Sequence, residues 1–218
     1  MPIVTKIVPQ RRREQRYNIY VDGAYRLSLS QEQLADAGLR VGDELDQAAL
    51  DRLVASSDFG KALDRTYRYL SYRARSRHEI ITYLRQRHYD DDLVGRVVEE
   101  LERHRLVDDG RFAAQWVEDR QLLNPRSRRH LQAELRHKHI DPVHIETALA
   151  SIDSQAEIYA ATQLIDTKHL RQRYTDHRKL VRYLMSIGFS AETITVALMG
   201  GQDAVDQPES HQPQQGNN

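Results

Sequence analysis

A helical pattern recurs three times in the C-terminal two-thirds of this chain and limits what the chain can fold into. Successive copies are offset by 51 residues from Leu84 to Leu135 and by 49 residues from Leu135 to Leu184. The copies occupy Ser76–Leu101, Ser127–Ile152 and Asp176–Gly201. The other coincident apolar sets are Ile80, Leu131 and Leu180; Tyr89, Ile140 and Phe189; Val94, Ile145 and Ile194; and Val98, Leu149 and Leu198. A fixed period of this size indicates stacked supersecondary units, each too small to bury its apolar face alone.

The repeats predict a mainly α fold. Each repeat is expected to hold a longer leading helix followed by two shorter helices joined by a tight turn. The expected leading helices are Phe59–Tyr72, Arg111–Leu122 and Gln155–Asp166. Three tandem repeats would form an elongated, curved array, because each unit packs only on its neighbours. Apolar residues at 39% and charged residues at 29% suit such thin layers. The pattern therefore favours an extended surface for a large partner over an enzyme pocket.

The first residues predict a small β-meander. Ile3–Val8 alternates, and two further apolar runs flank Asp22-Gly23, which is a strong signal for a two-residue hairpin turn. A sheet this small is marginally stable alone, so it should pack against helices. We therefore expect an N-terminal β-hairpin with short helices (1–57), three repeats (58–106, 107–152 and 153–201) and a polar, disordered tail (202–218).

Capping signals predict where the helices begin and end. Asp46 and Asp58 predict two separate helices, the first ending near Ser56 and the second beginning at Phe59. Further predicted caps or helix starts are Ser30, Ser76, Ser127, Asp153 and Ser190, and the predicted helix ends are Gly38 and Gly188. Asp108-Asp109 places negative charge at a helix start, and Pro142 suits the first turn of a helix.

Composition excludes several classes of protein. The chain has no cysteine, which excludes disulfides, thiolate metal sites and cysteine nucleophiles. No run approaches the roughly eighteen apolar residues of a membrane span, and no signal peptide opens the chain. We therefore expect a cytoplasmic protein that does not enter the membrane. The 32 basic residues balance 32 acidic ones, so net charge does not indicate nucleic-acid binding.

No group of residues predicts catalysis or metal binding. His137, His139 and His144 are close in sequence, but positions two apart on a helix point in different directions and no acidic cluster faces them at ligand spacing. Gly200-Gly201 ends a helix instead of opening one, so it is not a phosphate loop. We therefore expect no enzymatic activity, no metal and no cofactor.

Arginine recurs where two of the repeats begin their second helix. The predicted partner-binding residues are Arg73, Arg75 and Arg77 in repeat one, and Arg126, Arg128, Arg129, Arg136 and Lys138 in repeat two. Cations at a helix N-terminus oppose the helix dipole, so local helix stability does not explain them. The placement favours a face that binds phosphate or an acidic protein groove, and the alternative is a solvated face with scattered ion pairs. Arg11, Arg12 and Arg13 form a second candidate basic patch.

Several aromatic residues lie near these arginines. Tyr67, Tyr69, Tyr72 and Tyr83 could stack on nucleic-acid bases, but packing in the core or at an interface is favoured. Trp116 follows Phe112 at helical i, i+4 spacing and is assigned to the core.

At these residues the chain resembles the RecX family. The resemblance is carried by Tyr69–Ser76 with Glu79 and Leu84, by Leu106–Val117, and by Pro125–Ile140. The run Leu-Val-Asp-Asp-Gly-Arg-Phe-Ala-Ala-Gln-Trp in the second block is the most specific part. The resemblance covers about residues 59–200, and the β segment looks like the extension of longer members.

The resemblance implies a bacterial, cytoplasmic regulator of the RecA recombinase, active in DNA repair and the SOS response. It implies a right-handed array of three-helix repeats in the groove of the RecA–DNA filament, which limits filament extension, ATPase, strand exchange and repressor cleavage. No catalytic residue belongs to the family. His88, His139 and Asn124 stand where members usually carry glycine. Since histidine and asparagine tolerate left-handed backbone, we expect the turns to survive.

Two partner hypotheses stay open at this point. In the first, a monomer binds the RecA filament through the cations of repeats one and two. In the second, the chain binds single- or double-stranded DNA directly and uses Arg11–Arg13 as well, which predicts a steep loss of affinity with salt. The sequence does not assign RecA or DNA to a particular repeat.

Overall fold

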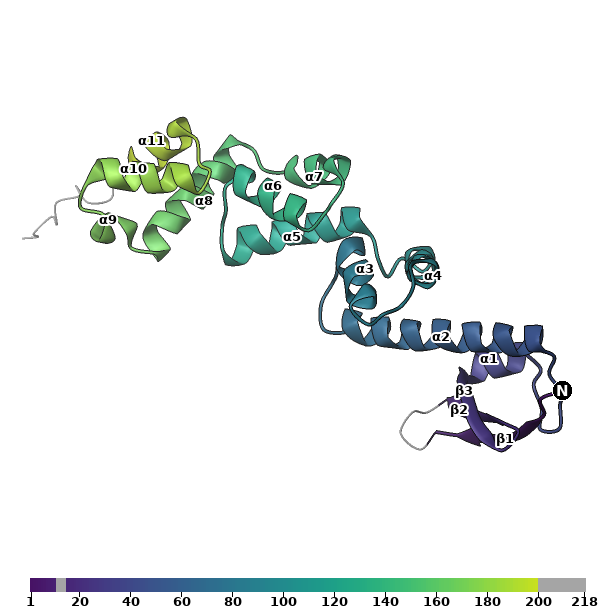
Figure 1. Cartoon of the computed structure of the whole chain (residues 1–218). Coiled ribbons are helices and arrows are strands. Elements are labelled where there is room, and N and C mark those ends of the chain that lie inside the picture. The colour runs from purple at the N-terminus through teal and green to yellow at the C-terminus, as the bar shows by residue number, and fades with distance from the viewer. Residues whose placement is uncertain (11–14, 200–218) are drawn as a thin grey trace, which may run out of the picture. The chain divides into compact units, whose positions relative to one another are not determined.

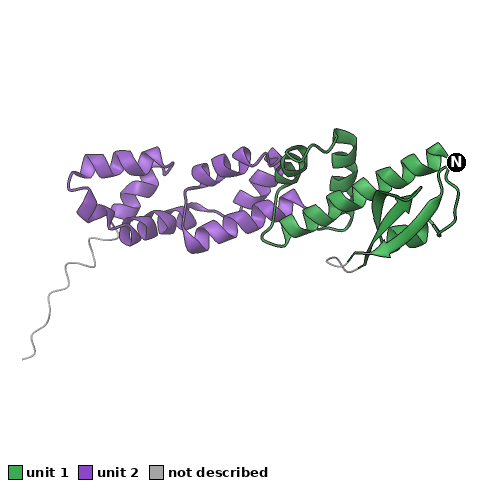
Figure 2. Cartoon of the chain, turned by 60° about the horizontal axis from the view of Figure 1, so that its bottom comes forward, with its two compact units in different colours: residues 1–107 green, residues 108–218 purple. Residues whose placement is uncertain are grey.

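The computed structural model describes residues 1–10 and 15–199, and shows a mainly helical chain with one small sheet (Figure 1). Arg11–Arg13 and the predicted tail at 202–218 lie outside these residues. Two compact units divide the chain, residues 1–107 and residues 108–218 (Figure 2). Among the helices in the described part, none is long and apolar enough to cross a membrane. The expected fold class, three-helix repeats preceded by a small antiparallel sheet, is confirmed.

The N-terminal sheet has the predicted meander topology. Strands β1 (Val4–Pro9), β2 (Arg16–Val21) and β3 (Ala24–Ser30) pair antiparallel in sequence order. Asp22 and Gly23 both have positive φ, 51° and 81°, as the predicted two-residue hairpin turn requires. Helices α1 (Gln31–Asp36) and α2 (Gln47–Leu70) cover this sheet.

A buried arginine joins the sheet to α2. Arg16 on β2 is only 4% exposed, and its guanidinium donates to Asp64 on α2 at 2.5 Å. The same side chain donates to the Ser28 hydroxyl and carbonyl on β3, each at 3.1 Å. A buried charge is tolerated only when it is paired and hydrogen-bonded, and this one meets both conditions.

The prediction of two helices around Asp58 is wrong, because α2 runs without a break from Gln47 to Leu70. The predicted boundary between residues 57 and 58 therefore falls inside a helix. Ser57 is fully buried and its hydroxyl accepts the backbone N–H of Ser28 at 3.3 Å, while Asp58 pairs with Lys61 instead of capping a helix. Contacts with the sheet thus hold the middle of α2 in place, and the local sequence around Asp58 does not predict such contacts.

Each repeat has the predicted three-helix plan. Repeat one uses the end of α2 with α3 (Arg77–Arg85) and α4 (Asp91–Arg103). Repeat two uses α5 (Asp109–Leu123), α6 (Arg128–His137) and α7 (Pro142–Leu149). Repeat three uses α8 (Ser154–Thr167), α10 (His177–Ser186) and α11 (Ala191–Met199), with an unpredicted short helix α9 (Leu170–Arg173).

The coincident apolar positions form the cores. Every member of the five aligned sets is buried except Tyr89, which is half-buried. The described residues hold four clusters, one under the sheet and one in each repeat, so every unit has cores of its own. Burial of a Leu or Ile side chain contributes about 1.5–3 kcal/mol, which makes these sets the main source of stability in each repeat.

The predicted caps and turns are largely confirmed. The side chains of Ser30, Asp46, Ser76, Ser127 and Asp153 accept a backbone N–H at a helix start, as predicted. Asp108 and Asp141 also cap their helices, which was not predicted. His88 and His139 have φ of 63° and 56°, so they adopt the left-handed backbone expected of them. Asn124 does not need that tolerance, because its φ is −157° and its backbone is extended.

Candidate functional site

The arginines that precede α3 are held by carboxylates. Arg73 donates to both oxygens of Glu79, at 2.8 and 3.1 Å, and this pairing raises the pKa of the guanidinium. Glu79 also accepts the backbone N–H of the cap residue Ser76 at 3.1 Å. Arg77 donates to Glu102 on α4 at 3.0 Å. Carboxylates therefore offset the unfavourable position of these two cations at the helix N-terminus.

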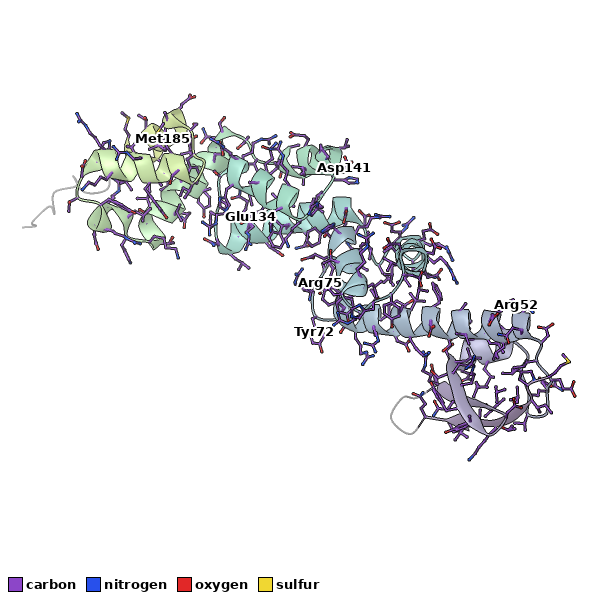
Figure 3. The ribbon with its side chains drawn as sticks, viewed as in Figure 1. Arg52, Tyr72, Arg75, Glu134, Asp141 and Met185 are labelled. Atoms are coloured by element: carbon purple, nitrogen blue, oxygen red, sulfur yellow. The ribbon has the colours of Figure 1, made fainter. Side chains whose placement is uncertain are left out.

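Arg75 belongs to a four-layer stack. The rings of Tyr69 on α2 and Tyr83 on α3 lie 4.0 Å apart and are nearly parallel, with an interplanar angle of 6°. The guanidinium of Arg75 lies 3.9 Å from the centre of the Tyr69 ring, and that of Arg87 lies 3.7 Å from the Tyr83 ring. Because the inner ring faces cover each other, each cation covers an outer face. The stack fixes the connector between the two helices, in which Arg75 lies (Figure 3).

The basic residues of repeat two divide into held and free cations. Arg128 donates to Glu146 at 3.1 Å and to the Leu149 carbonyl, so it ties α6 to α7. Lys138 lies 4.3 Å from the centre of the Trp116 ring. By contrast, ion pairs within the described residues include neither Arg126 nor the exposed pair Arg129 and Arg136.

Glu134 organises repeat two and was not predicted as a site residue. Its carboxylate accepts the Trp116 indole N–H at 2.7 Å and the Arg120 Nε–H at 2.9 Å. Burial opposes ionisation of this carboxyl, but the hydrogen bonds from Arg120 and Trp116 outweigh that effect and lower the pKa of Glu134. No sequence signal identifies it, because its partners lie 14 and 18 residues away on another helix.

Among the aromatic residues expected to pack, Tyr69, Tyr83 and Trp116 do so, whereas Tyr67 and Tyr72 are exposed. Tyr69 and Tyr83 pack on each other, and Trp116 packs half-buried against the core of repeat two. Tyr72 is not a core residue, because it is 83% exposed on the connector between α2 and α3 (Figure 3). Helix α2 ends at Leu70, so the chain has already left the helix at Tyr72.

Within the described residues, no group of three histidine, aspartate or glutamate side chains could hold a metal ion. His137 and His139 lie at the C-terminal end of α6, and His144 lies on α7 beside Gly110. The eight predicted cations thus remain the main candidate site, although their local partners differ from one residue to the next.

Comparison with known proteins identifies the family. Residues 2–46 match the regulatory protein RecX N-terminal domain, residues 62–101 the first RecX three-helix domain, and residues 108–149 the second. The chain belongs to the RecX family. It is 30% identical to the regulatory protein RecX of Bacillus licheniformis over 203 residues, covering 91% of this chain and 77% of that protein. The RecX of Bacillus subtilis is 28% identical over 208 residues, covering 91% and 76%.

A solved structure supports the same assignment. A crystal structure of regulatory protein RecX is 26% identical to the chain, with a TM-score of 0.75, and the match covers 91% of this chain and all of that one. These RecX proteins are named as regulators. The resemblance drawn from the three sequence blocks is therefore confirmed, and it extends to the N-terminal sheet.

Proposed function

We propose that this RecX-family protein is a non-enzymatic, monomeric regulator that binds the RecA–DNA filament in the bacterial cytoplasm. Bound there, it limits filament extension and with it ATPase, strand exchange and coprotease activity. The observation that carries this proposal is the match to RecX domains from residue 2 to residue 149. The repeats add support, since each has a small core of its own, which suits a protein that makes many modest contacts.

The predicted cations differ in how strongly local partners hold them, and so in how readily they could contact a partner protein. Among the described residues, no ion pair with a local carboxylate has to be broken before Arg126, Arg129 or Arg136 contacts a partner. Arg75 and Lys138 are positioned on aromatic rings. Arg73, Arg77 and Arg128 would have to exchange an existing carboxylate, so each should contribute less. We propose the first group as the main electrostatic contact.

The test is the DNA-dependent ATPase of RecA with substoichiometric amounts of this protein. The rate should fall over time, because a regulator that stops extension acts on many RecA subunits per molecule. No inhibition by the folded protein would contradict the proposed function. Tight binding to naked DNA with a steep salt dependence, and no preference for RecA-coated DNA, would favour direct DNA binding instead.

A matched pair of charge reversals tests the proposed contact. Arg129 and Arg178 are both exposed, and each is the second residue of its helix, α6 and α10. Glutamate at either position suits the helix dipole, so neither change should unfold the protein. We expect Arg129→Glu to weaken inhibition by about threefold to tenfold, in line with a charge at an interface rim, and Arg178→Glu to leave it unchanged. Equal effects would show that repeat two is not the contact.

A further inference from the structure

Two large apolar side chains stand out by their exposure. Leu123 is 85% exposed and Tyr72 is 83% exposed, more than any other large apolar residue in the described ranges 1–10 and 15–199. They are also equivalent, because each lies four residues before the cap serine of its repeat, Ser76 or Ser127. A single exposed apolar residue is ordinary on a protein surface. The same placement one repeat period apart is not explained by chance exposure.

The connector that bears Tyr72 is held in place by the contacts of its own arginines. Arg73 is clamped by Glu79 and also donates to the Ala74 carbonyl at 2.8 Å, while Arg75 is held on the Tyr69 ring. Neither interaction involves the phenol of Tyr72. The connector is therefore rigid while its largest apolar group faces solvent (Figure 3).

Leu123 is the last residue of α5, and the connector that follows it is fixed in a different way. The backbone N–H of Asn124 donates to the Arg120 carbonyl at 3.0 Å, and Gln121 donates to the Arg126 carbonyl at 3.4 Å. Pro125 restricts the backbone between them. A side chain displayed on a rigid segment loses little conformational entropy when it binds, which is the property of an interface anchor.

The chemistry that the two positions share selects the class of partner. A tyrosine ring could stack on a nucleic-acid base, but leucine has no π face and cannot. What the two have in common is an apolar body followed closely in sequence by cations, Arg75 in repeat one and Arg126 with Arg129 in repeat two. Such a pair fits an apolar pocket with acidic residues at its rim, on a protein.

The repetition selects the architecture of that partner. Two equivalent anchors on equivalent repeats fit a partner that offers the same pocket more than once, as a polymer of identical subunits does. Repeat three has the polar Gln172 four residues before its cap Asp176, so it carries no third anchor. We propose that Tyr72 and Leu123 are equivalent docking side chains, each of which enters an apolar, acid-rimmed pocket on successive subunits of a protein polymer. This rests on the proposed function, in which the polymer is the RecA filament.

The experiment measures binding of the labelled full-length protein to RecA assembled on single-stranded DNA with a non-hydrolysable ATP analogue, and to the naked DNA. Tyr72→Ala and Leu123→Ala should each weaken filament binding about tenfold, as loss of an interface anchor does, and the double variant should weaken it further. Tyr72→Phe keeps the apolar body and should bind like the wild type. Val143→Ala is the matched control, because Val143 is 70% exposed but lies on α7 at a position unrelated to the connectors.

The outcomes separate this proposal from the function on which it rests. If the wild type binds the filament and the double variant binds equally well, the docking proposal is overturned while the proposed function stands. If Tyr72→Ala weakens binding to naked DNA as well and Leu123→Ala changes nothing, base stacking replaces protein docking. If the wild type neither binds nor inhibits RecA filaments, both proposals fail together. Since both side chains are exposed, circular dichroism should show all variants folded.

Discussion

Repeats one and two build the same joint, between the leading helix and the second helix, from different chemistry. In repeat one, Tyr83 stacks on Tyr69. In repeat two the aligned positions hold Glu134 and Arg120, which form an ion pair at 2.9 Å that also binds the Trp116 indole. The apolar core fixes where the joint lies, because the aligned leucines are the same. The residues that link the two helices at this joint can then be aromatic or ionic. The aromatic joint and the ionic joint should respond differently to mutation and to acid.

The largest effect is expected when the ionic joint loses its carboxylate. Glu134→Ala leaves the Trp116 N–H and the Arg120 guanidinium without their acceptor, and should lower the free energy of unfolding of repeats two and three by about 2–3 kcal/mol. Urea denaturation followed by the fluorescence of Trp116, the single tryptophan, measures this directly. Glu146→Ala is the control, because that carboxylate is 58% exposed and should matter by less than about 1 kcal/mol. Equal losses would contradict the importance of the joint.

A second change tests how repeat three is attached to repeat two. Gly188 has φ of 95°, and a Cβ atom there would lie 2.7 Å from the Ser127 hydroxyl, which donates to the Ile187 carbonyl. Gly188→Ala adds backbone strain and displaces that hydrogen bond, so we expect a loss of about 2 kcal/mol. Hydrogen exchange should show α10 and α11 opening more often than in the wild type. Ser186→Ala at the end of α10 is the control, and unchanged exchange in Gly188→Ala would show that the turn adapts.

The aromatic joint of repeat one should be less sensitive. Arg75→Leu keeps an apolar stem but removes the cation from the Tyr69 ring, and should cost about 1 kcal/mol in thermal unfolding followed by circular dichroism. Arg85→Leu removes only an exposed ion pair with Asp91 and should cost less. If Arg85→Leu were the more destabilising of the two, the stack would contribute no more than an ordinary surface contact.

Acid should weaken the ionic joint of repeat two, because that joint depends on the ionised carboxylate of Glu134. The pKa of Glu134 is lowered in the folded state, so the unfolded chain binds the proton first as the pH falls below the ordinary value of 4.5. The stabilisation by Glu134 is therefore complete above that pH and is lost as the pH falls through the lower folded pKa. The difference in urea midpoint between the wild type and Glu134→Gln should be constant from pH 7 to 5 and shrink below pH 4.5. A difference that grew in acid would have the wrong sign.

The sequence predicts the features that depend on residues close together in the chain, and it misses those that depend on contacts between distant residues. The aligned apolar sets, most of the cap residues and the Asp22-Gly23 turn follow from spacings of a few residues, and the structure has them. The continuity of α2 depends on Ser57 meeting Ser28, 29 residues away, so the local signal at Asp58 predicted a break that does not exist. Glu134 was missed for the same reason. The exposure of Tyr72 was missed because its position in a helical pattern favoured packing.

The smallest effect expected is a gain in stability, in a test that compares the tight turns of repeats one and three. His88 occupies the place that Gly188 holds in repeat three, with φ of 63° where glycine has 95°. His88→Gly removes about 1 kcal/mol of left-handed backbone strain, but glycine also has more freedom in the unfolded chain. We therefore expect a net gain of about 0.5 kcal/mol in thermal unfolding. His104→Gly is the control, because His104 has φ of −84° and gains nothing from glycine, so it should be destabilised. A loss at both positions would show that the His88 side chain stabilises its turn by more than its backbone strains it.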